Sequence, residues 1–535
     1  MNKVLAGGSR DEFGERLKQK QKITSLISNV LNEKGFMPIN TPFIEKESTF
    51  EQYRDQNIFH LYDQAGDNLI LRPDLTLPVA RFLSSHQQEN DMSQLYYIGD
   101  VFRRTDYLSG EYNQETQAGI ELIGDDSFEA EIQALDIMLN FAKKFNITDV
   151  QVVLSDARLI DIILDTLQLD GELHRALKRA IEQKNVSEFE KLRAEIVDFP
   201  EFLNEWPLSY GEDGENVMWQ LQHMTAVATI TQGWLRLANH AHQYYPNVKV
   251  TVDLAAASPQ PYYTGTIIRG FIPTLGRYLF SGGRYDRLLE NFQKKLLPAV
   301  GIGLNIETIQ ADWEQSAYDL TTRQPIVMVL GKGRVEKDVR PLLKAAGIDT
   351  TPLDNPERKL IFDTADGRYR FILVKPNDVV KYLDRGIGDV GIVGSDTIAE
   401  QRQSHYDVLD LKTGRAQFVV AAPADFHLNL QRRQRIATKY PKVATKYFTD
   451  RGEDVALIKL EGSVELGPLT GLADAIIDIT QTGNTLRENH LQVHDIVGEV
   501  STHMLVRAGA LLRYQTELTQ VIQNLTKLLK EATNK

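Results

Sequence analysis

Apolar residues near the start of the chain recur with the period of an α-helix. Leu17, Ile23, Ile27 and Leu31 fall on one face between residues 16 and 34, which predicts an amphipathic helix. The next segment, GFMPINTPFIE, carries two prolines. These limit helix formation and favour a turn followed by extended chain.

Short apolar runs typical of β-strands follow on both sides of a helical region. Residues 126–243 have mostly helical patterns around one strand-like run, DVQVVLS. The other strand-like runs are NLILRPD, QLYYIGDVF, AGIELIG, VKVTVDLA, YYTGTIIRGFI and LGRYLFSGG. Strands in succession, with helices packed to one side, predict an antiparallel α+β domain.

The pattern changes after residues 311–324, ADWEQSAYDLTTRQ, which are polar and have little periodicity. Beyond them, strand-like and helical segments alternate as PIVMVLG, RVEKDVRPLLKAAG, RFILVKP, NDVVKYLDRG and DVGIVG. This alternation predicts parallel α/β packing. We therefore expect a first domain over residues 1–315, a linker over 316–324 and a second domain over 325–535.

Composition narrows the class of protein. A chain of 535 residues is too long for one hydrophobic core, and 42% hydrophobic with 25% charged residues is ordinary for a globular protein. The absence of cysteine excludes disulfides, thiolate zinc sites and cysteine nucleophiles. A net charge of −13 does not favour broad nucleic-acid binding. No apolar run suits a membrane span or a signal peptide, so we expect a cytoplasmic protein with no membrane contact.

The stretch DITQTGNTL, residues 478–486, is the first candidate for chemistry. It follows the apolar run ADAIIDI, and its glycine, amides and hydroxyls would meet a phosphate at the start of a helix. Asp474 and Asp478 lie four residues apart and share one face of a strand. An acid before the loop suits ribose hydroxyls. The alternative is an ordinary turn with a capping threonine.

Two other loops have similar chemistry. LGKGRVEKD places Lys332 and Arg334 in a glycine loop between a strand and a helix. DVGIVGSDT places a glycine and small polar residues after another strand. Ligands of α/β folds bind at such positions, beyond the carboxyl ends of strands.

The motifs KGR, DVGIVGSD, ATKYP, LEGSVELGP, GLADAIIDI and TGNTL occur here in one order. With them, residues 325–535 resemble the short form of ATP phosphoribosyltransferase. This implies a two-lobed α/β fold like a periplasmic binding protein of type II. Lobe one would cover about 325–415 plus the C-terminal segment, and lobe two about 416–500. The implied reaction joins ATP and phosphoribosyl pyrophosphate (PRPP) into 1-(5-phosphoribosyl)-ATP and pyrophosphate, with Mg2+ as cofactor and no metal site made by the protein.

The same resemblance implies roles for particular residues. The residues expected to bind PRPP are Asp474, Asp478, Thr482, Gly483, Asn484 and Thr485. Those expected to bind ATP are Gly333, Asp389, Gly394 and Ser395. The candidate catalytic residues are Lys332, Arg334, Arg358 and Lys375. The alternative for Arg358 and Lys375 is a solvated surface charge, and the family often has arginine where Lys375 stands.

Residues 1 to about 320 resemble histidyl-tRNA synthetases, which are class II enzymes. The segments that carry this resemblance are GFMPINTPFIE, LRPDLTLPVAR, YYIGDVFRRTDYLSGEYNQETQAGIELIG, PYYTGTI, SGGRYDRLL and PAVGIGLNIETI. Ser258 and Thr308 stand where active synthetases have arginine, and the motif 2 loop has Glu111 and Asn113 in GEYN where GRYR is usual. Because arginines stabilise the phosphates during adenylation, we expect no aminoacylation and no tRNA partner.

The amino-acid pocket of that family is better preserved. The residues expected to bind histidine are Asp74, Thr76, Arg103, Gln117, Glu121, Tyr263 and Tyr285. The alternative is a decayed pocket whose polar groups satisfy only each other. The chain is thus expected to be a transferase fused to a histidine-sensing activator and to form a homo-oligomer. Fusion would fix the ratio of the two parts at one to one and raise the local concentration of each. The rival hypotheses are a non-catalytic histidine sensor and a histidine-activating enzyme.

Overall fold

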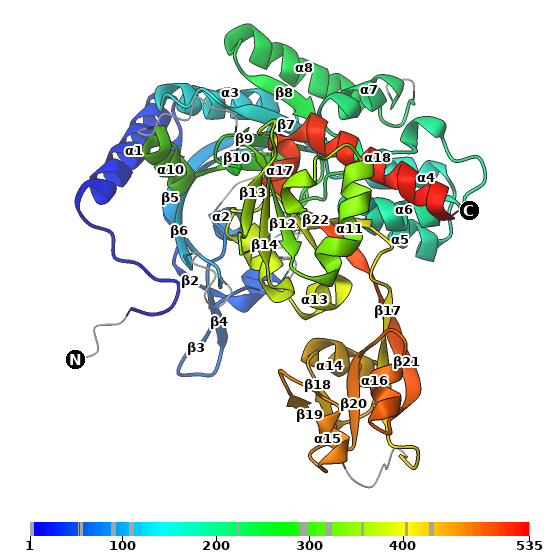
Figure 1. Cartoon of the computed structure of the whole chain (residues 1–535). Coiled ribbons are helices and arrows are strands. Elements are labelled where there is room, and N and C mark those ends of the chain that lie inside the picture. Colours follow the sequence, from blue (N-terminus) through cyan, green and yellow to red (C-terminus); the bar gives the residue numbers. More distant parts are fainter. Residues whose placement is uncertain are drawn as a thin grey trace. The chain divides into compact units, whose positions relative to one another are not determined.

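The computed structural model describes residues 5–51, 53, 57–86, 92–105, 112–221, 224–288, 290, 297–316, 324–354, 358–401, 405–426 and 433–533. The chain divides into two compact units, Met1–Arg323 and Gln324–Lys535 (Figure 1). Most of the expected linker, from residue 317 to residue 323, lies outside the described residues. Within the part described, no helix is both long and apolar enough to cross a membrane.

The N-terminal unit is built on an eight-stranded sheet with the order β1-β5-β6-β11-β10-β9-β7-β8. It is antiparallel from β5 to β7 and parallel in the pairs at each edge, which confirms the expected antiparallel core. The strands are β1 (Met37–Pro38), β5 (Ser93–Phe102), β6 (Gln114–Ile123), β7 (Gln151–Asp156), β8 (Lys249–Val252), β9 (Thr266–Ile272), β10 (Arg277–Arg284) and β11 (Ala299–Asn305).

Alternation along the central strands divides this sheet into two faces. On β6, Ala118, Ile120 and Leu122 join the large core formed with α1 (Gly14–Glu33), α3 (Glu129–Lys144), α8 (Ala228–Tyr244) and α10 (Ile306–Ser316). The expected helix over 16–34 is α1, whose buried stripe includes Ile23 and Ile27. The unit also contains α4 (Leu159–Thr166), α5 (Gly171–Glu182), α6 (Val186–Arg193), η2 (Glu201–Leu203), η3 (Trp206–Leu208) and α7 (Gly211–Leu221).

The other face of the sheet carries a smaller core and the polar pocket described below. Leu95, Tyr97 and Ile123 pack there with residues of α2 (Thr76–His86) and η1 (Glu47–Phe50). A three-stranded sheet adjoins them, formed by β2 (Ile44–Lys46), β4 (Asn68–Leu71) and β3 (His60–Tyr62).

The C-terminal unit contains two sheets. The first has the order β13-β14-β12-β15-β22-β16, and the second has the order β19-β18-β20-β17-β21. The first sheet contains β12 (Ile326–Gly331), β13 (Ile361–Asp363), β14 (Tyr369–Val374), β15 (Val390–Gly394), β16 (Tyr406–Asp410) and β22 (Thr502–Val506). The second contains β17 (Ala416–Ala422), β18 (Gln434–Thr438), β19 (Val455–Lys459), β20 (Ala475–Thr480) and β21 (Gln492–Val500). Nearly continuous apolar runs such as IVMVLG form the central parallel strands, because these are covered on both faces.

Helices and short turns connect these strands. They are α11 (Arg334–Ala345), η4 (Thr351–Leu353), η5 (Pro376–Asp378), α12 (Val379–Asp384), α13 (Ser395–Glu400), α14 (Pro441–Asp450), α15 (Leu466–Leu469), α16 (Asn484–Glu488), α17 (Ala508–Arg513) and α18 (Gln515–Thr533). The expected strand–helix alternation is present from β12 to α13.

The chain passes between the two sheets twice, at residues 411–415 and at Ser501, which we call the crossing segments. They run side by side, because the Leu411 N–H donates to the Thr502 carbonyl at 2.8 Å and the Thr502 N–H to the Thr413 carbonyl at 2.9 Å. In the first sheet Gly394, the last residue of β15, pairs with Thr502. In the second, Thr480, the last residue of β20, pairs with Gln417. The carboxyl ends of the central strands in both sheets therefore lie at the edges that the crossing segments join.

Candidate functional sites

The first sheet of the C-terminal unit brings basic side chains together at one edge. Gly331 at the end of β12 pairs with Val374 at the end of β14, so Lys332 and Lys375 follow neighbouring parallel strands. The Lys332 N–H donates to the Val374 carbonyl at 2.7 Å. Both lysines are exposed. Gly333 has φ +112°, a conformation that other residues rarely adopt, and a Cβ there would meet open space.

Arg334 connects this edge with the second sheet. It is the first residue of α11, and its Nη1 donates to Gln481 Oε1 at 2.6 Å. Gln481 directly precedes the loop Thr482–Thr485, so the two loops singled out by the sequence are in contact. Arg358 is exposed and follows residues outside the described part of the chain, and its relation to the other basic residues stays a prediction.

The loop from Thr482 to Thr485 has the geometry expected of a glycine turn. Gly483 adopts φ +70°, and Thr482, Asn484 and Thr485 are exposed. Asn484 and Thr485 begin α16, so their N–H groups have no acceptor within that helix. The Gly483 N–H, by contrast, already donates to Thr480 Oγ1 at 3.0 Å. The helix after the loop has only five residues, which limits the contribution of its dipole.

The two acids before this loop have different surroundings. Burial raises the pKa of the Asp478 carboxyl, and Glu465 and Asp396 add to the rise. Asp474 precedes β20 and is bound to Arg435, accepting from its backbone N–H at 2.8 Å and from Nη2 at 3.1 Å. Although the two acids share a face, a strand of this length separates them by about 13 Å. The structure therefore brings Asp478 to the loop and leaves Asp474 at the other end of the strand.

The residues expected to bind ATP are also divided. Gly394 ends β15, and Ser395 begins α13, where its Oγ accepts from the Ser501 N–H at 3.2 Å. Asp389 precedes β15 at the opposite end and is buried, bound to Arg507 at 2.9 Å and to the Val327 N–H at 3.0 Å. Asp389 therefore holds strands together and does not join Gly394, because one strand length separates them.

A polar cluster beside the crossing segments was not anticipated from the sequence. His503 Nδ1 lies 2.9 Å from Asp407 Oδ1, and its Nε2 lies 3.1 Å from Ser501 Oγ. Asp410 Oδ1 lies 4.0 Å from Nε2 and is itself paired with Lys412. Burial lowers the pKa of His503, but the hydrogen bond and charge of Asp407 raise it above its ordinary value. Only strand pairing brings these residues together, and no local motif marks them.

In the N-terminal unit, Glu121 lies at the centre of a buried polar pocket. Its Oε1 accepts from Thr76 Oγ1 at 3.0 Å, and its Oε2 accepts from the Tyr285 hydroxyl. Burial raises the pKa of Glu121 to about 7. Gly301 on β11 faces Glu121, and a Cβ there would lie 1.8 Å from Oε2. A glycine is required at this position because the carboxylate occupies the space.

Asp74 supplies a second buried acid. Its Oδ1 accepts from the Leu77 N–H at 3.1 Å, which caps α2. Its Oδ2 is buried without a hydrogen bond of ordinary geometry among the described residues. Burial raises the pKa of Asp74 to about 6, while the charge of Arg103 and the Tyr262 hydroxyl oppose the rise. Arg103 thus lies within electrostatic reach of Asp74.

Aromatic rings line this pocket. The Tyr263 ring lies 5.0 Å from that of Tyr262 and 6.5 Å from that of Tyr285. Burial raises the pKa of Tyr97 and Tyr262 well above 10, and both also feel the charges of Glu121 and Asp74. Gln117 lies four residues before Glu121 on β6 and therefore shares its face. The structure brings the expected residues to one face, and adds Tyr97 and Tyr262, which the sequence analysis missed.

At the positions where synthetases carry arginine, this chain has small polar residues whose side chains bond backbone carbonyls. Ser258 Oγ donates to the Gln260 carbonyl at 2.7 Å, and Thr308 Oγ1 donates to the Tyr278 carbonyl at 3.1 Å. Asn113 Nδ2 donates to the Gly7 carbonyl at 2.8 Å. Glu111 lies outside the described residues.

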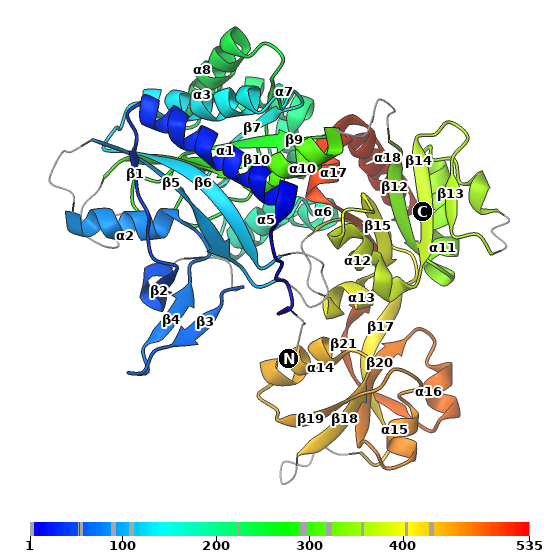
Figure 2. The ribbon, with the colours of Figure 1, turned by 90° about the vertical axis from the view of Figure 1, so that its left-hand side faces the viewer.

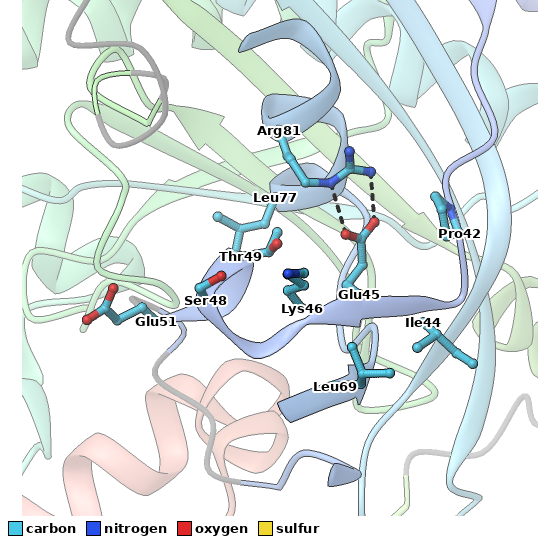
Figure 3. A pocket seen from close by; sticks show the side chains of 10 residues that line it. All are labelled: Pro42, Ile44, Glu45, Lys46, Ser48, Thr49, Glu51, Leu69, Leu77 and Arg81. Atoms are coloured by element: carbon cyan, nitrogen blue, oxygen red, sulfur yellow. Dashed lines mark hydrogen bonds and ion pairs between the residues drawn. The ribbon is translucent and has the colours of Figure 1, made fainter. Parts of the chain in front are cut away.

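A separate cavity of about 820 Å³ opens in the N-terminal unit beside β2, η1 and α2 (Figure 3). Glu45 and Arg81 face each other on its wall, with both carboxylate oxygens 2.9 Å from guanidinium nitrogens (Figure 3). None of the residues expected to bind histidine lines it. Lys46 and Glu51 also line the cavity, so its lining carries two basic and two acidic side chains.

Comparisons with known proteins agree with this division. Residues 8–309 match the family model described as histidyl-tRNA synthetase, and residues 375–530 match that of ATP phosphoribosyltransferase. An ATP phosphoribosyltransferase of Lacticaseibacillus casei is 53% identical over 203 residues, which span 38% of this chain and 96% of that protein. An ATP phosphoribosyltransferase regulatory subunit of the same species is 37% identical over 337 residues, which span 62% of this chain and 86% of that protein.

A solved structure supports the fold of the N-terminal unit. It is an ATP phosphoribosyltransferase regulatory subunit/histidyl-tRNA synthetase from Bacillus halodurans, with 22% identity and a TM-score of 0.52. The match covers 70% of this chain and 93% of that chain. The N-terminal unit thus has the fold of a class II aminoacyl-tRNA synthetase. The chain belongs to the histidyl-tRNA synthetase family through this unit and to the ATP phosphoribosyltransferase family through its C-terminal unit. The resemblance drawn from the motifs, a fusion of the two, is confirmed.

Proposed function

We propose that the C-terminal unit joins ATP and PRPP into 1-(5-phosphoribosyl)-ATP and pyrophosphate. The observation that carries this proposal is the contact between Arg334 and Gln481, at 2.6 Å. It places the basic loop of one sheet against the Thr482–Thr485 loop of the other. A substrate with a phosphate at one end and a pyrophosphate at the other fits two such loops.

The chemistry assigns a task to each group of residues. Adenine N1 forms a bond to the anomeric carbon of PRPP as the bond from that carbon to the pyrophosphate oxygen breaks. Negative charge grows on the departing pyrophosphate, which Lys332, Arg334 and Lys375 would stabilise. Thr482, Gly483, Asn484 and Thr485 would hold the 5-phosphate, and Asp478 the ribose hydroxyls. Gly333, Gly394 and Ser395 would border the ATP, and Arg358 would add charge from its exposed position.

Magnesium would enter with the substrates. Among the described residues, no group of three or more acidic or histidine side chains could hold a metal ion. The phosphate oxygens of ATP and PRPP are good ligands for Mg2+, which needs few from the protein. We therefore assign no residue to the metal.

We also propose that the N-terminal unit binds free histidine and reports its concentration to the transferase. Asp74 Oδ2, which is buried without a hydrogen bond of ordinary geometry among the described residues, suits an ammonium group. Arg103 suits a carboxylate, and Glu121 with Tyr263 and Tyr285 an imidazole. Gln117 and Thr76 would complete the pocket. Ser258 and Thr308, which bond backbone carbonyls where synthetases carry arginine, support a pocket that binds the amino acid without activating it.

The proposal extends to the organisation of the chain. Residues 1–315 would form the regulatory domain, 316–324 a linker and 325–535 a catalytic domain shaped like a two-lobed periplasmic binding protein. The protein would act in the cytoplasm as a homo-oligomer, with no tRNA partner. Histidine would inhibit by binding one of two quaternary arrangements more tightly than the other.

The test mixes the purified full chain with ATP, PRPP and magnesium, and measures pyrophosphate and phosphoribosyl-ATP with and without histidine. Product that falls as histidine rises is the expected result. Product that is indifferent to histidine would retain the transferase and refute the sensor. No product in any condition, together with measurable histidine binding, would favour a sensor without catalysis.

A further inference from the structure

Two carboxylates on α13 reach the first turn of α14, which belongs to the other sheet of the C-terminal unit. The Tyr440 hydroxyl, just before α14, donates to Asp396 Oδ2 at 3.2 Å. The Val443 N–H donates to Glu400 Oε1 at 2.9 Å. The two helices lie next to each other in both views of the ribbon (Figure 2).

Glu400 accepts a hydrogen bond from the first turn of α14, where the neighbouring sequence provides no capping side chain. Val443 is the third residue of α14, and its N–H has no acceptor within the helix. Tyr440, at the capping position, provides no side-chain cap. A carboxylate at a helix N-terminus is stabilised by both the N–H group and the dipole. The first turn of α14 is therefore capped from the other sheet, and only while the two lie together.

Tyr440 is positioned by contacts within its own sheet. Its N–H donates to Thr438 Oγ1 at 2.8 Å, and its ring packs edge-on against Phe418 with centroids 5.0 Å apart. Burial, followed by the charges of Asp396 and Asp478, raises the pKa of Tyr440, so its hydroxyl stays a donor at neutral pH. Asp396 Oδ1 lies over Gly394, where a Cβ would come within 2.1 Å, so the glycine leaves the space that this carboxylate occupies.

This contact lies beside the proposed reaction site. Tyr440 follows β18, which pairs with β20, and β20 carries Asp478. Asp396 follows Gly394 at the basic edge of the first sheet. With the contact of Arg334 and Gln481, the two edges are held together at two places.

We propose that Asp396 and Glu400 form a clasp with Tyr440 and Val443 that holds the two lobes closed around the substrates. The four residues are positioning residues, and their role in turnover rests on the transferase activity proposed above. Loss of the clasp shifts the population towards an open form. An open form binds both substrates more weakly, so the KM for ATP and the KM for PRPP rise together while kcat changes little.

The chain offers a direct measurement of closure, because it contains no cysteine. Lys381→Cys on α12 and Thr449→Cys on α14, both at exposed positions, give two unique sites for spin labels in the full chain. Double electron–electron resonance spectroscopy then measures the distance between the two spin labels, and hence between the lobes, without any need for turnover. The variants are Glu400→Ala, Glu400→Gln, Asp396→Asn and Tyr440→Phe, which keeps the ring on Phe418. The matched control is Glu531→Gln, an exposed acid on α18.

We expect Glu400→Ala to lengthen and broaden the distance distribution, and to raise both KM values about tenfold, the factor that 1.4 kcal/mol represents. Glu400→Gln and Tyr440→Phe should give smaller changes, and the double variant Asp396→Asn/Tyr440→Phe should match its single variants if those two groups act as a pair. A distance distribution unchanged in Glu400→Ala and Asp396→Asn overturns the clasp, whatever the kinetics. Longer distances in a protein whose parent form has no turnover would support the clasp and refute the transferase activity instead.

Discussion

The two candidate sites of this chain differ in the solvent exposure of their charged side chains. Asp74 and Glu121 in the N-terminal unit are buried, with 8% and 0% of their surface exposed, among tyrosine rings. Lys332 and Lys375 in the C-terminal unit are exposed and extend from strand ends. The side chains of the first site are already in contact without a ligand. Those of the second site extend into water, and a bound polyanion would have to draw them together.

This contrast indicates different ligands. Buried acids with raised pKa values gain most from a small cation or zwitterion that brings its own donors, because burial without one is costly. Exposed lysines stay hydrated when no ligand is bound, so their charge costs little free energy. They form charge-assisted hydrogen bonds when phosphates bind. The proposed histidine pocket would therefore keep a fixed shape, and the proposed reaction site would close on its substrates.

The largest effect expected is at the basic edge. Lys332→Ala should lower kcat/KM for phosphoribosyl-ATP formation by about 10²- to 10³-fold, because a charge that stabilises the departing pyrophosphate is removed. Steady-state kinetics of the full chain measures it. Lys381→Ala, which removes an exposed lysine from the same unit, is the control. Equal activity in the two variants would mean that the basic edge is a solvated surface.

The next effect tests the buried pocket. Glu121→Gln should weaken histidine binding by roughly 10- to 100-fold, since a hydrogen-bonded charge is lost. Isothermal titration calorimetry with histidine measures the affinity, and Glu172→Gln, an exposed acid on α5, is the control. Unchanged affinity would show that histidine, if it binds, does so elsewhere.

The pKa values of the pocket predict its dependence on pH. Asp74 and Glu121 have folded pKa values raised to about 6 and about 7, so the folded unit holds more protons than the unfolded chain between about pH 4 and 7. Stability without histidine should fall as pH rises through that window. Histidine should offset the loss once the acids ionise, so its stabilising shift in Tm should be larger at pH 8 than at pH 5.5. An equal shift at both pH values would contradict the assignment of these acids.

The smallest effect expected is in the cluster beside the crossing segments. Its pH dependence involves the charged groups around His503, which are Asp407, Asp410 and Lys412. The folded pKa of His503 is raised, so its contribution to stability is present below about pH 6.5 and is lost as pH rises through the folded pKa.

His503→Gln should therefore lower the Tm of the C-terminal unit at pH 6 by about 2–4 °C, the shift expected for about 1 kcal/mol. At pH 9 the difference should disappear. Calorimetry at the two pH values measures it, and Asp407→Asn should remove the same dependence. A deficit of equal size at both pH values would indicate lost packing and no role for the charge.

Much of the fold followed from local patterns. The helical period over residues 16–34 predicted α1, and the change to strand–helix alternation after residue 324 predicted the second unit. Gly483 was predicted in a turn because it stands among small polar residues after an apolar run, and its φ of +70° is one that glycine adopts freely. The replacement of synthetase arginines by Ser258 and Thr308 was also visible, because motif positions are fixed by their neighbours in sequence.

The candidate sites were predicted less completely. Asp474 and Asp389 carry the right chemistry, but each lies at the wrong end of its strand, bound to Arg435 or Arg507. The spacing of residues in the sequence predicted which face of the strand each acid occupies. It could not predict at which end of the strand the ligand would bind. Tyr97 was missed because a tyrosine in an apolar run looks like any other core residue. Tyr262 was missed although it stands beside Tyr263 in the segment PYYTGTI.

The sequence by itself therefore determined the elements, their order and the residue types available at each loop. These depend on periodicity and turn chemistry within a few residues. Only the tertiary structure decided which groups meet. Tyr285 reaches Glu121 across 164 positions, His503 reaches Asp407 across 96, and Val443 reaches Glu400 across 43. Such contacts depend on sheet register and on how the chain returns between sheets. For Glu121 and His503, which lie on strands, a shift of one residue would turn the side chain to the opposite face.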